Sequence, residues 1–254
     1  MQSSLFRLNA ALESSHWWFV GRRRIITGLV REMLPPESGS RVIDIGCGTG
    51  ANIASLADDY EAAGFDLSED AIGLARERFP DVSFYLRDGI EYLGQMAGGD
   101  TLVLLNDVIE HIEDDRSFLE SVVNAAPEGT LFLLTVPADP RLWSPHDVSH
   151  GHFRRYTLAT FEELWGDLPV SVLLHSYFNA RLYWVVRAIR AVTASLNSSY
   201  GSADSDLSLP PSWLNGWLTS ILSGELLHLR RRLHSGNSAY RSGVSVISVL
   251  QKDE

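Results

Sequence analysis

Short apolar runs alternate with helix-like stretches along most of the chain. The run at 102–105 is continuously apolar, which is typical of a strand buried on both faces of a sheet. Repeated strand–helix units of this kind predict an α/β fold with a Rossmann-like, doubly wound sheet and right-handed crossovers. The predicted strands are 42–45, 62–66, 82–86, 102–105, 131–136, 170–174 and 244–250.

An N-terminal helical cap is predicted over residues 1–40. Leucines recur near helical spacing up to Leu12, and the segment 16–19 then interrupts the pattern. A second amphipathic helix fits 21–34 and ends before two prolines. Further along, a helix is expected over 117–124, and Thr160 with Glu163 resembles a capping box that opens another helix.

Between the sixth and seventh strands lies a long excursion, 177–243, which is too long for an ordinary connection. It contains a basic amphipathic helix at 181–190, a polar linker at 197–208 and an apolar helix that follows two prolines. We therefore expect a core made of 41–176 and 244–254, with 177–243 as a helical insertion. That insertion is predicted to be a packed subdomain, a substrate lid, a dimer contact or an interfacial helix on an anionic membrane.

Composition narrows the class of protein. The 254 residues carry a net charge of −11, which argues against a nucleic-acid backbone as the partner. The single cysteine does not suggest oxidising export, no apolar run reaches the ~18 residues of a membrane span, and the N-terminus lacks a signal-peptide core. We expect a cytoplasmic protein, as a monomer or homodimer, with peripheral membrane contact open through 181–232.

The segment 42–50 carries the strongest chemical signal. A short apolar strand runs into a glycine-rich turn and then a helix, which brings backbone N–H groups close to a nucleotide. Gly46, Gly48 and Ala51 satisfy the loose dinucleotide pattern, with Asp66 at the spacing of a ribose-binding acid. Asp44 argues against that interpretation, because a buried anion beside the turn repels a pyrophosphate and suits a ligand with an ammonium and a sulfonium.

Acidic or amide side chains follow all of the first four predicted strands. Ligands of open α/β sheets bind outside the carboxyl ends of the strands, where these side chains lie. Asp66 is placed for the ribose hydroxyls, Asp88 for an adenine amino group and Asp107 for an ammonium. Four such strand ends make a stronger signal than the glycine turn alone.

The sequence D-I-G-C-G-T-G resembles the first motif of class I S-adenosylmethionine-dependent methyltransferases. The segment 106–112 resembles the broad type 11 group, and the segments 16–23 and 152–157 resemble a bacterial subgroup that also has a helical insertion. The resemblance implies a seven-stranded sheet of order 3-2-1-4-5-7-6 with the last strand antiparallel. It also implies S-adenosyl-L-methionine as cofactor, with S-adenosyl-L-homocysteine as product.

Site residues are predicted from the strand ends and the resemblance together. The residues expected to bind the cofactor are Arg22, Asp44, Gly46, Cys47, Gly48, Asp66, Leu67, Asp88, Gly89, Asn106, Asp107 and Val108. Trp17, Trp18, His152 and Tyr156 are expected in the substrate pocket, and His111, His146 and His150 are the candidates for catalysis. No metal is expected, because the spacing H-x3-H-x-H is not a standard zinc pattern.

The function predicted is in-line transfer of a methyl group from S-adenosylmethionine to a small-molecule acceptor. The sequence leaves the methylated atom open among oxygen, nitrogen and carbon. The alternatives are an NAD-type oxidoreductase and a member of the same fold that binds the cofactor without methylating.

Overall fold

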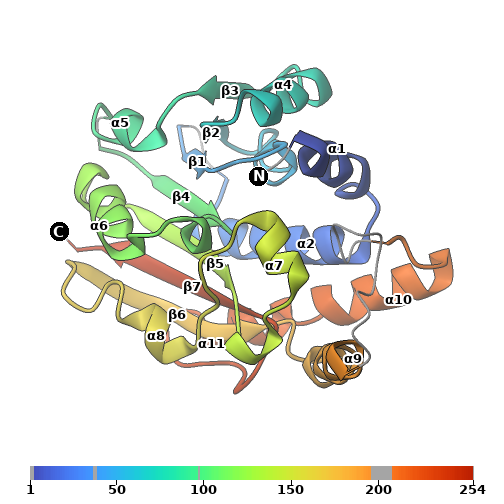
Figure 1. Ribbon diagram of the computed structural model, residues 1–254. Coiled ribbons are helices and arrows are strands. Elements are labelled where there is room, and N and C mark those ends of the chain that lie inside the picture. Colours follow the sequence, from blue (N-terminus) through green and yellow to red (C-terminus); the bar gives the residue numbers. More distant parts are fainter. Residues whose placement is uncertain (1–2, 37–38, 97, 196–207, 254) are drawn as a thin grey trace.

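A computed structural model describes residues 3–36, 39–96, 98–195 and 208–253, of which 3–4 and 193–195 are described in backbone only. Within these ranges seven strands form one sheet of order β3-β2-β1-β4-β5-β7-β6 (Figure 1). Only β7 is antiparallel to its neighbours, β5 and β6. The predicted topology is therefore confirmed. The strands are β1 Arg41–Ile45, β2 Glu61–Asp66, β3 Ser83–Leu86, β4 Thr101–Asn106, β5 Leu131–Pro137, β6 Val170–Phe178 and β7 Ser245–Lys252.

Helices cover both faces of the sheet because the central strands are apolar on both sides. Leu102 and Leu104 of β4 belong to one buried cluster, which also holds residues of α2, α4, α10 and α11. Val103 and Leu105 belong to the other, with α5, α6 and α8. The helices are α1 Ser3–Leu12, α2 Trp17–Met33, α3 Ala51–Ala54, α4 Glu69–Arg78, α5 Gly89–Leu93, η1 Ile109–His111, α6 Asp115–Ala125, η2 Pro140–Leu142, α7 Pro145–His150, α8 Leu158–Glu162, α9 Tyr183–Ser195, α10 Ser212–Ser223 and α11 Leu226–Arg232.

Two helix starts differ from the sequence prediction. Helix α2 begins at Trp17, not at Gly21, because the imidazole of His16 caps it by accepting from the backbone N–H of Trp18 at 3.3 Å. Helix α8 begins at Leu158, and its capping box pairs Thr157 with Thr160, so the predicted box from Thr160 to Glu163 is wrong. In both cases a cap side chain lies earlier in the chain than the first strongly apolar residue.

Part of the insertion packs directly on the core. Helix α10 lies along α2, and Gly21 and Gly28 of α2 leave room for Leu222 and Leu226. A Cβ on Gly28 would lie 2.4 Å from Leu226 Cδ2, so this close approach depends on glycine. The predicted linker at 197–208 lies outside the described residues apart from Ser208. Among the described helices, none has the length and hydropathy needed to cross a bilayer.

Candidate active site

The glycine turn after β1 has a backbone that only glycine adopts readily. Gly46, Gly48 and Gly50 have φ angles of +74°, +54° and +86°. The backbone N–H groups of Gly46 and Cys47 donate to the carbonyl of Phe65, at 2.8 and 3.0 Å, which ties the turn to β2. A Cβ on Gly46 would lie 2.5 Å from the side chain of Val108, so the turn also packs closely against the chain after β4.

Asp44 is buried beneath the turn and is 1% exposed. Neither of its carboxylate oxygens has a hydrogen-bond partner among the described residues. Burial raises the pKa of Asp44 to about 8, the charge of Arg22 lowers it in part, and Asp66 adds to the rise. Such a carboxyl group lacks the compensation that buried charges normally have. A cation bound nearby would favour the ionised form of this group, whereas the negative charge of a pyrophosphate would oppose it.

Asp66 ends β2 and Asp88 follows β3, so both acids lie at the carboxyl ends of their strands, as predicted. Asp66 accepts from the backbone N–H of Gly48 at 2.9 Å and from that of Ser68 at 2.8 Å. Asp88 is the N-cap of α5 and accepts from Ile90 at 2.8 Å. Each carboxylate oxygen has two lone pairs, so these contacts fix the side chains and leave acceptor capacity for a ligand.

The residues beside the acids differ in exposure. Leu67 follows Asp66 and is 78% exposed, and it does not line the cavity described below. Gly89 follows Asp88 and is buried, and a Cβ there would lie 2.8 Å from Ile45. Both remain predicted cofactor contacts.

Arg22 reaches from α2 to the end of β4. Its guanidinium lies 3.0 Å from the carboxylate of Asp107 and donates to the hydroxyl of Thr135 at 3.0 Å. Thr135 in turn donates to Asp107 at 3.1 Å, and Asn106 adjoins the same group. Thr135 was missed in the sequence, because it lies inside an apolar strand and gave no signal. Asp107 has a φ of 56°, an uncommon conformation outside glycine that often marks functional sites.

One cavity of about 1140 Å³ connects the glycine turn to the insertion. Its lining includes Gly46, Cys47 and Gly48 of the turn, Asn106 and Asp107, and residues of α9 and α10. The cofactor edge and the space beyond it are therefore continuous.

Both predicted tryptophans line this cavity. Trp18 also stacks on Phe178, with ring centroids 6.0 Å apart. It therefore serves the core and the cavity together. The prediction that Tyr156 belongs to the substrate pocket is wrong, because Tyr156 does not line the cavity. It is 2% exposed, lies in the core and donates to Asp115 at 2.6 Å.

The four predicted histidines gather on one wall of the cavity. The rings of His146 and His150 are 3.9 Å apart between centroids, and those of His111 and His152 are 4.7 Å apart. Burial, and then the neighbouring His152, lower the pKa of His111 to about 4, and burial chiefly lowers that of His146 to about 3. Both rings are neutral at physiological pH, so each has a lone pair.

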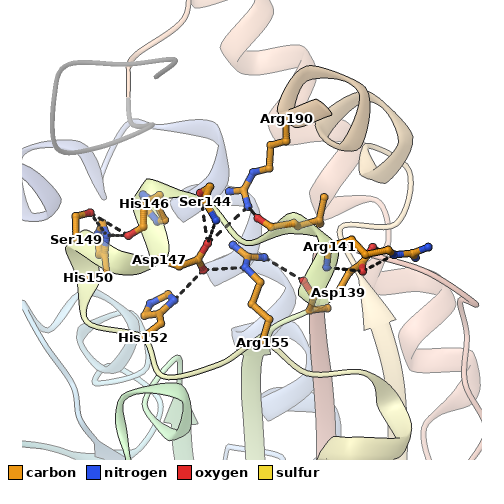
Figure 2. A network of polar contacts seen from close by, with 12 residues as sticks. Asp139, Arg141, Ser144, His146, Asp147, Ser149, His150, His152, Arg155 and Arg190 are labelled. Atoms are coloured by element: carbon orange, nitrogen blue, oxygen red, sulfur yellow. Dashed lines mark hydrogen bonds and ion pairs between the residues drawn. The ribbon is translucent and has the colours of Figure 1, made fainter. Parts of the chain in front are cut away.

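Asp147 organises this wall and is fully buried (Figure 2). It accepts from Nδ1 of His152 at 3.0 Å, from Nε of Arg155 at 2.8 Å and from the backbone N–H of Ser144 at 2.9 Å. Burial alone would raise the pKa of Asp147, but the contacts with His152 and Arg155 more than offset this and hold it below its usual range. The carboxylate is charged, and it fixes the ring of His152.

Arg190 of α9 and Glu110 of η1 complete the wall. Arg190 lies 3.9 Å from Asp147 and donates to the carbonyl of Leu142, so the insertion contributes directly to the site (Figure 2). Glu110 lines the cavity and is 0% exposed. Its only signal in the sequence was its place in the motif 106–112, where no role was assigned to it.

Known proteins share parts of this architecture. A family model described as "Methyltransferase domain" matches residues 19–168. The chain is 33% identical over 105 residues to a ubiquinone biosynthesis O-methyltransferase of Aromatoleum aromaticum, covering 39% of this chain and 45% of that protein. A trans-aconitate 2-methyltransferase of Variovorax paradoxus is 29% identical over 107 residues, covering 41% of each. The chain thus spans about half the length of the curated relatives it matches.

Solved structures show the same fold at low sequence identity. A methyltransferase from a complex with the Haloferax volcanii Trm112 methyltransferase activator superposes with a TM-score of 0.57 at 18% identity, covering 99% of this chain and 95% of the other. Phosphoethanolamine N-methyltransferase 2 of Haemonchus contortus, in complex with S-adenosyl-L-methionine, gives a TM-score of 0.54 at 18% identity, covering 91% and 52%.

Proposed function

The chain belongs to the family of methyltransferase domains, and on that premise we propose that it transfers a methyl group from S-adenosylmethionine to a small-molecule acceptor. The observation that carries the proposal is the continuous cavity, which joins the glycine turn to a wall of histidines. A donor at the turn and an acceptor at the wall would lie within one continuous cavity. Placing two reactants in this way can supply roughly 7–11 kcal/mol of the barrier.

The residues at the sheet edge fit S-adenosylmethionine. The turn presents backbone rather than side chains, Asp66 and Asp88 retain acceptor capacity, and Asp44 is a buried carboxyl group without a partner among the described residues, whose ionised form a cationic ligand would stabilise. Arg22 and Asp107 line the cavity beside the turn as charges of opposite sign, which suits the carboxylate and ammonium of a methionine moiety. The bound cofactor supplies an activated methyl group on a positively charged sulfur.

The histidine wall supports an acceptor that gives up a proton. His150 lies 2.8 Å, through Nδ1, from the carbonyl of His146, which can only accept, so neutral His150 has its lone pair on Nε2. We assign His150 as the first candidate for the base, with His111 and His146 beside it. One positioned base contributes about 10²–10⁴-fold to a rate.

The acceptor end of the cavity supports an organic molecule with an apolar body. Ile189, Leu214 and Leu218 line the cavity together with Trp17. One of the relatives is named as an O-methyltransferase, which favours oxygen as the methylated atom. Nitrogen and carbon remain open.

Contact with a membrane surface is a further part of the proposal. Trp184, Trp213 and Trp217 are 65%, 73% and 57% exposed on α9 and α10, and tryptophan suits a lipid–water interface. Arg181 donates to carbonyls at the end of α10, and Arg190 turns toward Asp147. The proposed contact therefore rests on the exposed tryptophans rather than on these two arginines.

Calorimetry with S-adenosylhomocysteine tests the cofactor assignment. We expect binding by the wild type and a loss of at least tenfold in affinity for Asp66→Ala and Asp88→Ala, because each removes acceptors at the sheet edge. Asp58→Ala is the matched control. Asp58 is an exposed acid just before β2, so it lies at the amino end of that strand, whereas Asp66 lies at its carboxyl end. No binding by the wild type, or equal binding by all four proteins, would contradict the assignment.

A transfer assay with a labelled methyl donor and an acceptor found by screening tests the base in the same proteins. His150→Gln should keep its affinity for S-adenosylhomocysteine and lose 10²–10⁴-fold in kcat. A variant that keeps full turnover would exclude His150 as the base and leave the cofactor assignment intact.

A further inference from the structure

Glu110 has no part in the proposed methyl transfer, yet its carboxyl group is buried without a hydrogen-bond partner among the described residues. It lies in η1 directly after β4 and is 0% exposed. Arg22 and Arg155 line the same cavity but donate to Thr135 and Asp147 instead. A buried carboxylate without such contacts is costly unless a cation compensates it.

Two histidines lie where they could share a cation with this carboxylate. One ligand atom from each of Glu110, His111 and His152 lies within 4.8 Å of the other two. The backbone N–H of Phe153 donates to the carbonyl of Glu110 at 2.8 Å, which ties the loop carrying His152 to η1. Metal ligands stand about 2.0–2.2 Å from a transition-metal ion, so small side-chain rotations bring three such atoms onto one ion.

The hydrogen bonding of His152 matches that of a metal ligand. Its Nδ1 donates to Asp147, so the lone pair of neutral His152 lies on Nε2. A carboxylate behind a ligating histidine is the usual outer partner, which fixes the ring and raises its basicity. Asp147 is itself held by Arg155 and Ser144, so the ring has a rigid support (Figure 2).

We propose that Glu110, His111 and His152 bind one divalent transition-metal ion, with Asp147 as the outer partner of His152. Two nitrogens and one carboxylate suit Zn²⁺, Mn²⁺, Fe²⁺ or Co²⁺ better than Mg²⁺ or Ca²⁺, which prefer oxygen ligands. Three protein ligands leave coordination positions open, and all three residues line the cavity. The proposal departs from the sequence prediction of no metal, whose argument weighed only the spacing of the histidines at 146, 150 and 152.

The ion also suggests a class of acceptor, and this part rests on the proposed function. An oxygen that binds a divalent ion loses its proton at a lower pH than in water. The site would therefore favour an acceptor with a hydroxyl or carboxylate oxygen near the methylated atom. The metal site itself stands or falls separately from methyl transfer.

Metal binding can be measured directly on the full chain without an affinity tag. After equilibration with Co²⁺ and dialysis, we expect about one ion per chain and a visible absorption band from its coordination. Glu110→Gln and His152→Asn should each lose the band and at least tenfold in Co²⁺ affinity. Asp147→Asn should weaken binding by about 10–100-fold, since it removes only the outer partner.

His146→Asn is the matched control, because it removes a histidine of the same wall outside the proposed set. It should bind Co²⁺ as the wild type does. Loss of Co²⁺ in His146→Asn together with full binding in Glu110→Gln and His152→Asn would overturn the assignment. Binding of S-adenosylhomocysteine by each variant distinguishes a lost metal site from a lost fold. A wild type that retains no Co²⁺, or a folded Glu110→Gln that retains all of it, refutes the proposal while leaving the methyltransferase assignment untouched.

Discussion

The chemistry of single residues at this site depends on their burial as well as on their residue type. Asp44 was predicted as a cofactor contact from its place before the glycines. The structure adds that it is 1% exposed, with neither oxygen hydrogen-bonded among the described residues. Its role depends on that isolation, because a carboxyl group without compensation favours a positively charged ligand.

The raised pKa of Asp44 predicts that the free protein loses stability as the pH rises. Desolvation first, and Asp66 after it, raise the pKa from 3.8 to about 8. Between these values the unfolded chain releases a proton that the folded protein keeps, so stability falls with pH in this window, by up to about 1.4 kcal/mol per pH unit. Thermal unfolding from pH 5 to 8.5 should show this fall, and Asp44→Asn should flatten it.

Asp66→Asn is the control for that measurement, since Asp66 accepts two backbone N–H groups and is not isolated. It should leave most of the pH dependence in place. A wild type whose unfolding temperature stays level across the window, or a slope that survives in Asp44→Asn, would show that Asp44 does not carry the effect.

At the scale of helices and strands, the sequence predicted the elements well and their starts less well. Strand β4 was recognisable because it is apolar on both faces, and the sheet order followed from the resemblance. The start of α2 was missed because its N-cap is the imidazole of His16, which is not one of the usual capping side chains. Asn215 of the insertion supports the same turn by accepting from the backbone N–H of Trp17 at 2.8 Å, and no local pattern reveals a contact from 198 residues away.

Helices α9 and α10 carry the proposed membrane contact, which vesicle co-sedimentation can test. A double variant, Trp213→Ser with Trp217→Ser, removes two of the largest exposed apolar side chains of α10. We expect the fraction bound to phosphatidylglycerol vesicles to fall severalfold, because interfacial binding scales with buried apolar area.

Leu86→Ser is the control for the vesicle experiment. Leu86 is 47% exposed on β3, which lies at the opposite edge of the sheet from β6, the strand that precedes the insertion. Its substitution should leave binding unchanged. If the double variant still binds like the wild type, the exposed face of α10 has another purpose, such as a dimer contact.

For the molecule as a whole, the position of the acids and glycines at the strand ends could be predicted, and the histidine wall only in part. The edge is encoded in short segments, each a strand followed directly by its acid or glycines. The wall forms where the loop after β5 packs on η1, which brings Asp147 and His152 beside Glu110 and His111. Those contacts join residues about 40 apart in the chain, so no spacing rule could have paired them.

The same arrangement predicts how the whole fold responds to ligands, and it separates the two interpretations of the glycine turn. A ligand that binds only the folded state at 100 times its Kd stabilises it by about 2.7 kcal/mol. For a chain of 254 residues this corresponds to a rise of about 5–10 °C in Tm. S-adenosylhomocysteine should produce that rise in a thermal shift measurement, and NAD⁺ at the same concentration should not, because Asp44 lies beneath the turn where a pyrophosphate would sit. An equal rise with NAD⁺ would favour the dinucleotide interpretation, and a rise with neither would contradict both interpretations.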